Sequence, residues 1–275
     1  MTEAQLKKQE VELSPPKREI ELHNQRLEAY LEELDFENLS PEEILSWASA
    51  TFANRAILET SFQYTGVAMI HMVAAHQLDL RIATLDTLRL PPETYQFIDQ
   101  VKARYNCQVE VCKPDSTQID SMTERFGEYL FFDSKALQEY CCQVRKERPH
   151  NELIKTADCW ISGVRRDQSS FRRDTTSKAS LVLEYGSRRK ILKLNPMAAW
   201  NEEQLLEYIK TNDIPTHPLY AQGYPSIGCV ICSTPTLPGE EKRAGRWRWF
   251  NNNNQADSDD KKECGLHVPG QLYNI

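Results

Sequence analysis

Apolar and polar runs follow a strand–helix–strand order through the first half of the chain. Residues 56–61 form an apolar run, residues 67–76 are rich in Val, Met and Ala, and residues 80–85 form a second apolar run. Residues 92–105 carry apolar side chains at helical spacing, and residues 108–112 form a third short run. This repetition predicts an α/β fold with a mostly parallel sheet and helices on both faces.

Further strands are predicted in the second half of the chain. Residues 158–164 form an apolar run that ends at two arginines. Residues 181–185 and 190–194 either pair with each other as a hairpin or extend the sheet. Both possibilities keep this part of the chain within the same α/β unit.

Capping patterns mark the starts of two helices. Ser40 is followed by Pro41 and, three positions after the serine, by Glu43. Asn201 stands three positions before Gln204. In this pattern each side chain accepts a hydrogen bond from the backbone N–H of the other residue, which predicts helices beginning just after residues 40 and 201.

The carboxyl ends of the predicted strands are the expected ligand site, as in other parallel α/β sheets. A nucleotide is therefore expected at the turns after Ser61 and Leu85. The loop over residues 60–66 offers hydroxyls and amides at a helix N-terminus, which suits phosphate or sulfate but equally suits an ordinary connection. The strand over residues 158–164 ends at Arg165, which predicts positive charge at the same edge.

Composition shifts divide the chain into three parts. Residues 1–25 are predicted to be a charged, loosely ordered extension, and residues 26–250 to be the α/β domain. Residues 251–275 are predicted to be a mobile tail, because the polar run over residues 251–260 is low in complexity. The chain has no internal repeat.

Composition favours a cytoplasmic enzyme. The chain has 275 residues, a net charge of −7 and eight irregularly spaced cysteines. A chain of this length can bury a core without disulfides, so its cysteines suggest metal-binding or catalytic thiols in a reducing compartment. The negative charge argues against a nucleic-acid-binding surface. The charged start has no signal segment, and no apolar run reaches the ~18 residues of a membrane span.

Basic residues gather in two clusters despite the acidic balance. Such clusters indicate either a pocket for a small anion or solvated surface charge. The first cluster contains Arg165, Arg166, Arg172 and Arg173, and the second contains Lys242, Arg243, Arg246 and Arg248.

Four cysteines have the character of metal ligands. Cys229 and Cys232 form a CxxC pair, which is compatible with zinc, a redox disulfide or an iron–sulfur cluster. Cys141 and Cys142 are adjacent, which is awkward for one zinc ion but suits different corners of a cubane cluster. An iron–sulfur cluster is therefore the first interpretation, zinc the second, and a buried core pair the third. The cysteines in predicted strands are expected to be core residues: Cys107, Cys112 and Cys159.

Cys264 differs from the other cysteines. It follows the polar run and precedes a glycine, and His267 stands three positions later. An exposed thiol with basic neighbours is a candidate nucleophile, whereas an incidental cysteine near a frayed end is the simpler alternative.

Motifs spread over most of the chain carry a family resemblance. From about residue 50 onward the chain resembles the assimilatory adenylyl-sulfate (APS) reductases, which share a family with the phosphoadenylyl-sulfate (PAPS) reductases. The motifs are Thr84-Leu85-Asp86-Thr87 with Arg89-Leu90, Pro92-Glu93-Thr94-Tyr95, Cys141-Cys142 with Arg145-Lys146, Ser162-Gly163 with Arg165-Arg166-Asp167-Gln168-Ser169, Leu194-Asn195-Pro196, Gly223-Tyr224-Pro225-Ser226-Ile227-Gly228-Cys229 with Cys232, Arg243-Ala244-Gly245-Arg246-Trp247, and Glu263-Cys264-Gly265-Leu266-His267.

The resemblance implies a Rossmann-like adenine nucleotide α-hydrolase fold and a thiol mechanism. Cys264 would attack the sulfur of APS, forming S-sulfocysteine and releasing AMP, and thioredoxin or glutaredoxin would then free sulfite. The four paired cysteines would hold a 4Fe–4S cluster, and Lys146 would link it electrostatically to the substrate. The remaining substrate-contacting residues would be Arg243, Arg246, His267, Arg165, Arg166, Ser61, Leu85, Asp86 and Thr87.

One loop departs from the family pattern, close to Ser-Phe-Gly-Ala-Glu-Asp. Residues 61–66 read Ser-Phe-Gln-Tyr-Thr-Gly, which lacks the acidic pair and leaves open the choice between APS, PAPS or both. The cluster cysteines favour APS. Two other hypotheses are an ATP-pyrophosphatase or nucleotide transferase of the same fold, and a zinc-stabilised binding protein. Relatives are often oligomeric, so a homo-oligomer is an open possibility.

Overall fold

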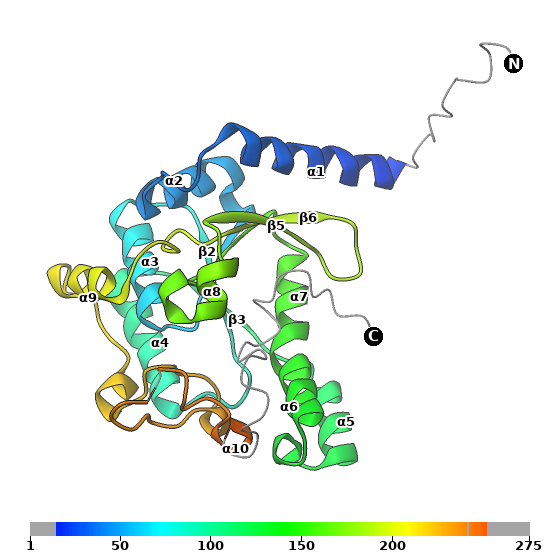
Figure 1. Ribbon diagram of the computed structural model, residues 1–275. Helices are drawn as coiled ribbons and strands as arrows, with labels where there is room; N and C mark the ends of the chain where they lie inside the picture. Colours follow the sequence, from blue (N-terminus) through cyan, green and yellow to red (C-terminus); the bar gives the residue numbers. More distant parts are fainter. Residues whose placement is uncertain (1–14, 241, 252–275) are drawn as a thin grey trace, which may run out of the picture.

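Six strands form one sheet in the order β3-β2-β1-β4-β6-β5 (Figure 1). The structure is a computed structural model and describes residues 15–240 and 242–251. Neighbouring strands are parallel, except that β5 is antiparallel to β6. The strands are β1 (Ala56–Glu59), β2 (Arg81–Leu85), β3 (Val109–Cys112), β4 (Cys159–Ile161), β5 (Ala179–Leu183) and β6 (Lys190–Leu194).

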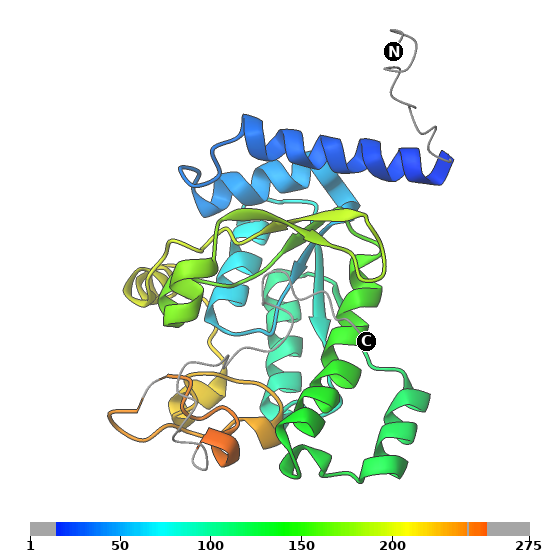
Figure 2. The same cartoon turned by 45° about the vertical axis from the view of Figure 1, so that its right-hand side comes forward.

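Helices cover both faces of the sheet, which confirms the predicted α/β architecture (Figures 1 and 2). The helices α2, α3, α4 and α9 lie on one face, and α5, α6 and α7 lie on the other. The helices are α1 (Pro15–Glu33), α2 (Pro41–Phe52), α3 (Tyr64–Ala75), α4 (Pro92–Tyr105), α5 (Ser116–Phe126), α6 (Lys135–Cys142), α7 (Arg148–Ile154), α8 (Ser170–Thr175), α9 (Glu202–Thr211) and α10 (Arg248–Asn251).

The alternation of side chains along β1 separates two apolar layers. Ala56 and Leu58 are fully buried in the large core formed with α2, α3 and α4. Ile57 points to the other face, where it packs with Leu153 of α7. Because successive residues of a strand face opposite sides, Glu59 belongs to the same face as Ile57.

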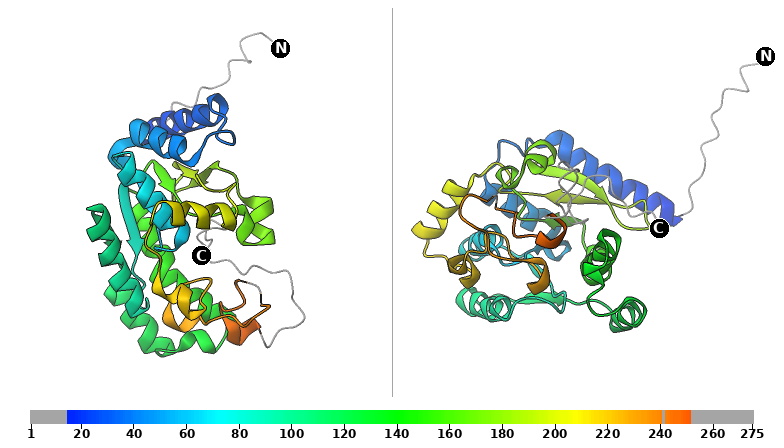
Figure 3. Two further views of the ribbon diagram at one scale, coloured as in Figure 1. Left: turned by 90° about the vertical axis from the view of Figure 1, so that its left-hand side faces the viewer. Right: turned by 60° about the horizontal axis from the view of Figure 1, so that its bottom comes forward.

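The N-terminal boundary of ordered structure differs from the sequence prediction. Residues 15–25 were expected to be loosely ordered, but they form the first part of α1. This helix lies along β5 and β6 (Figure 3). Its side chains bond to the start of β6: His23 Nε2 lies 2.9 Å from the Lys190 carbonyl oxygen, and Asn24 Nδ2 donates to the Arg188 carbonyl. Tertiary contacts therefore hold a segment whose sequence is strongly charged.

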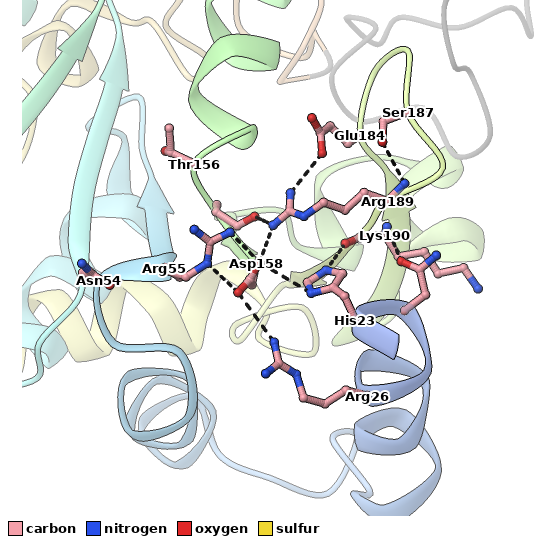
Figure 4. A network of polar contacts seen from close by, with 12 residues as sticks. His23, Arg26, Asn54, Arg55, Thr156, Asp158, Glu184, Ser187, Arg189 and Lys190 are labelled. Carbon is pink, nitrogen blue, oxygen red and sulfur yellow. Dashed lines mark hydrogen bonds and ion pairs between the residues drawn. The ribbon is translucent and has the colours of Figure 1, made fainter. Parts of the chain in front are cut away.

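Charged groups dock the same helix to the amino ends of the strands (Figure 4). Asp158 lies just before β4 and accepts two hydrogen bonds from Arg55, at 2.6 and 2.8 Å. Arg189 also pairs with Asp158, and the His23 ring and the Arg26 guanidinium each lie 3.8 Å from it. The network joins α1, β1, β4 and β6 at one edge of the sheet.

Most other predicted elements are confirmed, with local shifts. Both capping boxes are present, at Ser40 and Asn201. The segment over residues 179–194 forms a hairpin and extends the sheet, so both alternatives hold together. The strand expected over residues 158–164 is shorter, because the chain leaves the sheet at Ser162, whose hydroxyl bonds to Asn195 Oδ1 at 2.6 Å. In the part of the chain that the structure describes, no helix combines the length and apolar character needed to cross a bilayer.

An irregular segment after α9, residues 212–240 and 242–247, covers the carboxyl ends of the strands. It contains short 3₁₀ turns at Pro218–Gln222 and Val230–Cys232. Figures 2 and 3 show this segment at the end of the molecule opposite α1. On the other face, α6 continues through a π-helical turn, Gln143–Glu147, directly into α7. The candidate site is enclosed by the carboxyl ends of the strands, the irregular segment, and the continuous helix formed by α6, the π-helical turn and α7.

Candidate active site

A cavity of about 240 Å³ opens at the carboxyl ends of β1, β2 and β4. This is the edge at which the sequence predicts a ligand site. The expected nucleotide-contacting residues Ser61, Leu85 and Thr87 line it. Asp86 does not line it: this buried carboxylate accepts hydrogen bonds from Tyr95 Oη at 2.7 Å and from the Leu88 backbone at 2.9 Å.

The loop over residues 60–66, which is the expected nucleotide loop, contacts the irregular segment through its unusual residues. Gln63 Oε1 accepts a hydrogen bond from the Ile227 backbone N–H at 3.0 Å. The Tyr64 ring stacks on the Tyr220 ring with centroids 3.7 Å apart and an interplanar angle of 3°. The Tyr64 N–H also donates to the Tyr220 hydroxyl at 3.1 Å, and burial raises the pKa of Tyr220. The departure from the family loop thus ties α3 to the segment that leads to Cys229.

Basic side chains dominate the cavity wall. Arg165 is buried, donates to Thr65 Oγ1 at 2.8 Å and pairs with Asp167. Arg166 lies elsewhere, since it pairs with Glu37 and bonds to the Thr176 carbonyl. Among the residues that the structure describes, the basic residues of the wall are Lys146, Arg165, Arg172, Lys242, Arg243 and Arg246, and the acidic ones are Glu59 and Glu202. This excess of positive charge suits an anionic ligand.

Arg246 is held against the CxxC segment. Its Nε donates to the Cys232 carbonyl at 3.1 Å, and its guanidinium lies over the Trp247 ring, 4.8 Å from the centroid. A Cβ at Gly228 would lie 2.8 Å from the Arg246 guanidinium nitrogen. A larger residue at this position would displace the Arg246 guanidinium, whereas glycine leaves room for it beside the cavity.

The four cysteines of the two sequence pairs line a second, smaller cavity beside the first. None of the four forms a disulfide with another described residue. Thr87 Oγ1 lies 3.1 Å from Cys229 Sγ, and Gln138 Nε2 donates to Cys142 Sγ at 3.2 Å. Thiols that are far apart in the sequence therefore meet where α6 faces the irregular segment.

The arrangement of these thiols limits what they can bind. Burial raises the pKa of Cys141, and it raises the pKa of Cys232 to about 12, so deprotonation requires compensating positive charge. Within residues 15–240 and 242–251, no three His, Cys, Asp or Glu side chains converge tightly enough to hold one metal ion. A polynuclear cluster needs no such convergence, because each thiolate bonds a different iron.

The other three cysteines of the described residues lie apart from this cavity. Cys159 is fully buried, and burial raises its pKa. Cys107 and Cys112 are half-buried and pack against apolar clusters. These positions agree with the packing role expected from their predicted strands. Cys264 and His267 lie outside the described residues, so their roles remain predictions.

Several residues of the cavity wall have no signal in the sequence. Tyr220 and Glu202 come from elements far from the nucleotide loop, and only their place in the fold brings them to the cavity. Glu59 reaches it from the end of β1, and Trp160 reaches it from the middle of β4. Glu59 could have been found as a carboxylate directly before the expected nucleotide loop.

Comparisons with known proteins agree with this geometry. The phosphoadenosine phosphosulfate reductase domain matches residues 55–235. Adenosine 5'-phosphosulfate reductase of Agrobacterium fabrum is 36% identical over 221 residues, covering 80% of each chain. The Rhizobium meliloti enzyme of the same name is 37% identical and covers 82% of this chain and 81% of its own.

A solved structure agrees at the level of the fold. The phosphoadenylyl-sulfate reductase from Candida auris, crystallised with phosphate, superposes with a TM-score of 0.60 at 24% identity, covering 76% of this chain and 96% of its own. The predicted adenine nucleotide α-hydrolase-like fold is therefore confirmed. With the family match and the two sequence relatives, this places the chain in the phosphoadenosine phosphosulfate reductase family of oxidoreductases.

Proposed function

We propose that this protein reduces adenosine 5′-phosphosulfate to sulfite and AMP with electrons from thioredoxin or glutaredoxin, in assimilatory sulfate reduction. One observation carries the proposal. The basic cavity and the thiol cavity share a wall formed by Thr87, Lys146, Cys229, Arg246 and Trp247. An anion in the first cavity would therefore lie against the cysteine-lined site, as expected for a reductase of this kind.

The proposed reaction has two steps. The Cys264 thiolate forms a bond to the sulfonate sulfur, while the bond from that sulfur to the phosphate oxygen breaks and AMP leaves with the electron pair. A thiolate of reduced thioredoxin then attacks Cys264 Sγ and displaces sulfite with the S–S electron pair. The second thiol of thioredoxin resolves the mixed disulfide, so the dithiol supplies both electrons.

The cavity residues would bind the anion and orient it. Lys146, Arg243 and Arg246 would neutralise the phosphosulfate, and His267 would assist from the tail. Such donors stabilise the negative charge that develops on the leaving phosphate. Arg165 is committed to Thr65 and Asp167, so it would shape the nucleotide pocket more than it neutralises the ligand.

A 4Fe–4S cluster fits the four thiols better than a single zinc ion. Cys141, Cys142, Cys229 and Cys232 would hold it, and cluster-bound thiolates near Lys146 would supply a negative charge opposite the substrate. The fit rests on four cysteines from two segments of the chain that line one cavity, and on the adjacency of Cys141 and Cys142, which suits different iron atoms of a cluster.

The names of the relatives favour APS over PAPS as substrate. The Agrobacterium and Rhizobium enzymes are both named adenosine 5'-phosphosulfate reductases. Dual specificity remains the alternative proposal, because the nucleotide loop departs from the family pattern. A cytoplasmic location and a homo-oligomer also remain proposals.

The test is sulfite release from APS and from PAPS, side by side, with reduced thioredoxin under anaerobic conditions. We expect turnover of APS at least about tenfold faster than that of PAPS. Cys264→Ser is expected to abolish release while retaining iron and acid-labile sulfide. Retained turnover in that variant would reject the nucleophile, and ATP-dependent adenylation without sulfite release would support a nucleotide transferase instead.

A further inference from the structure

A buried acid–histidine pair connects the two halves of the site. Glu59 ends β1, and His150 lies in α7 on the face of the sheet opposite α3. Glu59 Oε2 lies 2.8 Å from His150 Nδ1, and the two side chains are only 10% and 6% exposed. The His150 ring also contacts the Trp160 ring edge-on, with centroids 4.6 Å apart. The pair is thus fixed by a hydrogen bond and by packing.

Both partners adjoin groups of the proposed reaction. Glu59 directly precedes the nucleotide loop that begins at Thr60. His150 stands four residues after Lys146, where the π-helical turn Gln143–Glu147 continues into α7. Glu59, Trp160 and Lys146 all line the basic cavity. The pair therefore joins the nucleotide loop to the helix turn that carries Lys146.

The position of Lys146 depends on an irregular helix turn. Lys146 lies in the π-helical turn, where the backbone is wider than in an α-helix and its register is less constrained. On the N-terminal side, Arg145 anchors this turn by donating to the Thr87 carbonyl at 3.1 Å. On the C-terminal side, Arg148 bonds Gln118 of α5, and His150 bonds β1. Only the last of these three contacts reaches the strand that leads into the nucleotide loop.

We infer that Glu59 and His150 are positioning residues that hold Lys146 at a fixed distance from the bound nucleotide. The inference rests on the proposed function, because it assigns Lys146 to the sulfonate end of the substrate. A buried carboxylate is costly without a hydrogen-bond partner, so its pairing with His150 fixes the geometry of both chain segments. Neither residue needs to touch the substrate for this role.

The test replaces the pair by apolar residues of similar size, Glu59→Met with His150→Leu. Replacing both partners avoids an unpaired buried charge, so the variant is expected to fold. Glu59→Gln keeps an acceptor for His150 and serves as the conservative variant. His23→Leu removes a half-buried histidine at the opposite edge of the sheet and is the matched control.

Binding is measured by calorimetry in a Cys264→Ser background, with AMP and with APS. The double variant is expected to bind AMP within about twofold of the parent, but to lose about tenfold of the preference for APS over AMP. With Cys264 present, kcat for sulfite release should fall about 100-fold, since small misplacements of catalytic groups have effects of this size. Glu59→Gln should restore most of the preference, and His23→Leu should leave it unchanged.

The link to Lys146 is tested by a double-mutant cycle. In a Lys146→Ala background, replacing Glu59 and His150 should lower the preference for APS over AMP by less than about a further twofold. An equal loss with and without Lys146, or an unchanged preference in the double variant, would overturn the inference. Absence of sulfite release by the unmodified protein would instead reject the proposed reaction, and the binding cycle would still decide the role of the pair.

Discussion

The two ends of the same strands use charge in opposite ways. At the amino end, Asp158 pairs with Arg55 and Arg189, and Arg189 also pairs with Glu184. At the carboxyl end, basic side chains outnumber acidic ones around a cavity. Charge is balanced by carboxylates at the amino edge, whereas basic residues exceed acidic ones around the cavity at the carboxyl edge.

The electrostatics of the amino edge explain its structural role. Burial alone would raise the pKa of Asp158, but hydrogen bonds from Arg55 and the charges of Arg189 and His23 outweigh it, and the pKa is lowered. Paired buried charges fix the relative positions of chain segments, and removal of one partner is costly. Clustered arginines alone therefore do not identify a binding site, because the number of neighbouring carboxylates decides whether their charge is balanced.

The largest effect is expected from breaking the amino edge. Asp158→Ala leaves Arg55 and Arg189 without their shared partner, so the free energy of unfolding should fall by about 3 kcal/mol. Urea unfolding measures this change. Glu152→Ala, which breaks the exposed Lys155 pair, should cost less than about 1 kcal/mol. If Asp158→Ala lowered kcat/KM of the folded protein tenfold, the division of roles between the two edges would be wrong.

The next effect concerns the carboxyl edge. Arg246→Ala removes a cation from the wall shared by both cavities, so kcat/KM for APS should fall about 100-fold. Steady-state sulfite release measures it, with iron content determined in parallel. Arg248→Ala is the control, because Arg248 pairs with Glu240 outside the cavity wall and should change kcat/KM by less than about twofold. Equal losses of kcat/KM in Arg246→Ala and Arg248→Ala would contradict the assignment of the carboxyl edge to anion binding.

A smaller effect is expected from the loop that departs from the family pattern. Gln63→Ala leaves the Ile227 N–H without its acceptor, so stability should fall by about 1 kcal/mol and KM for APS should rise severalfold. Thermal unfolding and kinetics measure the two changes. Gln222→Ala, at an exposed position of the same segment, should alter neither. An unchanged KM in Gln63→Ala would mean that the tie to the irregular segment does not affect substrate binding.

The smallest effect is the pH dependence at the amino edge. Burial lowers the pKa of His23, so the unfolded chain takes up this proton more readily than the folded protein. Its contribution to stability is present above the unfolded pKa of about 6.5 and is lost as pH falls below it. The free energy of unfolding should fall between pH 7.5 and 5.5 in both proteins. The fall should be smaller in His23→Gln than in the unmodified protein, by less than about 1 kcal/mol. A steeper fall of the unfolding free energy in His23→Gln would contradict the expected direction. His76→Gln, at an exposed position, is the control for the loss of a histidine that is not buried.

Local patterns predicted the regular parts of the fold. The predicted bounds of α4 and β6 agree with the structure at both ends, because apolar spacing and turn residues mark them. The capping boxes at Ser40 and Asn201 also form as the sequence indicates. Helix α1 was not predicted, because the contacts that hold it are with β6 and the residue Arg188 before it, more than 160 positions away.

The candidate site was only partly predictable for the same reason. Motifs located the cysteine pairs and most basic residues of the cavity wall. The Tyr64–Tyr220 stack and the Glu59–His150 pair join residues 156 and 91 positions apart, and no local pattern marks such contacts. Arg165 and Arg166 are neighbours in the sequence, yet their side chains lie in different places. Arg165 lines the cavity, and Arg166 pairs with Glu37.

The most direct test of the account is a search for the covalent intermediate. The protein is mixed with APS without a reductant, digested, and analysed by mass spectrometry of its cysteine peptides. The account predicts one added SO₃ group on Cys264, its loss as sulfite on addition of reduced thioredoxin, and no adduct in Cys264→Ser. An adduct on another cysteine, or sulfite release without any adduct on Cys264, would contradict it.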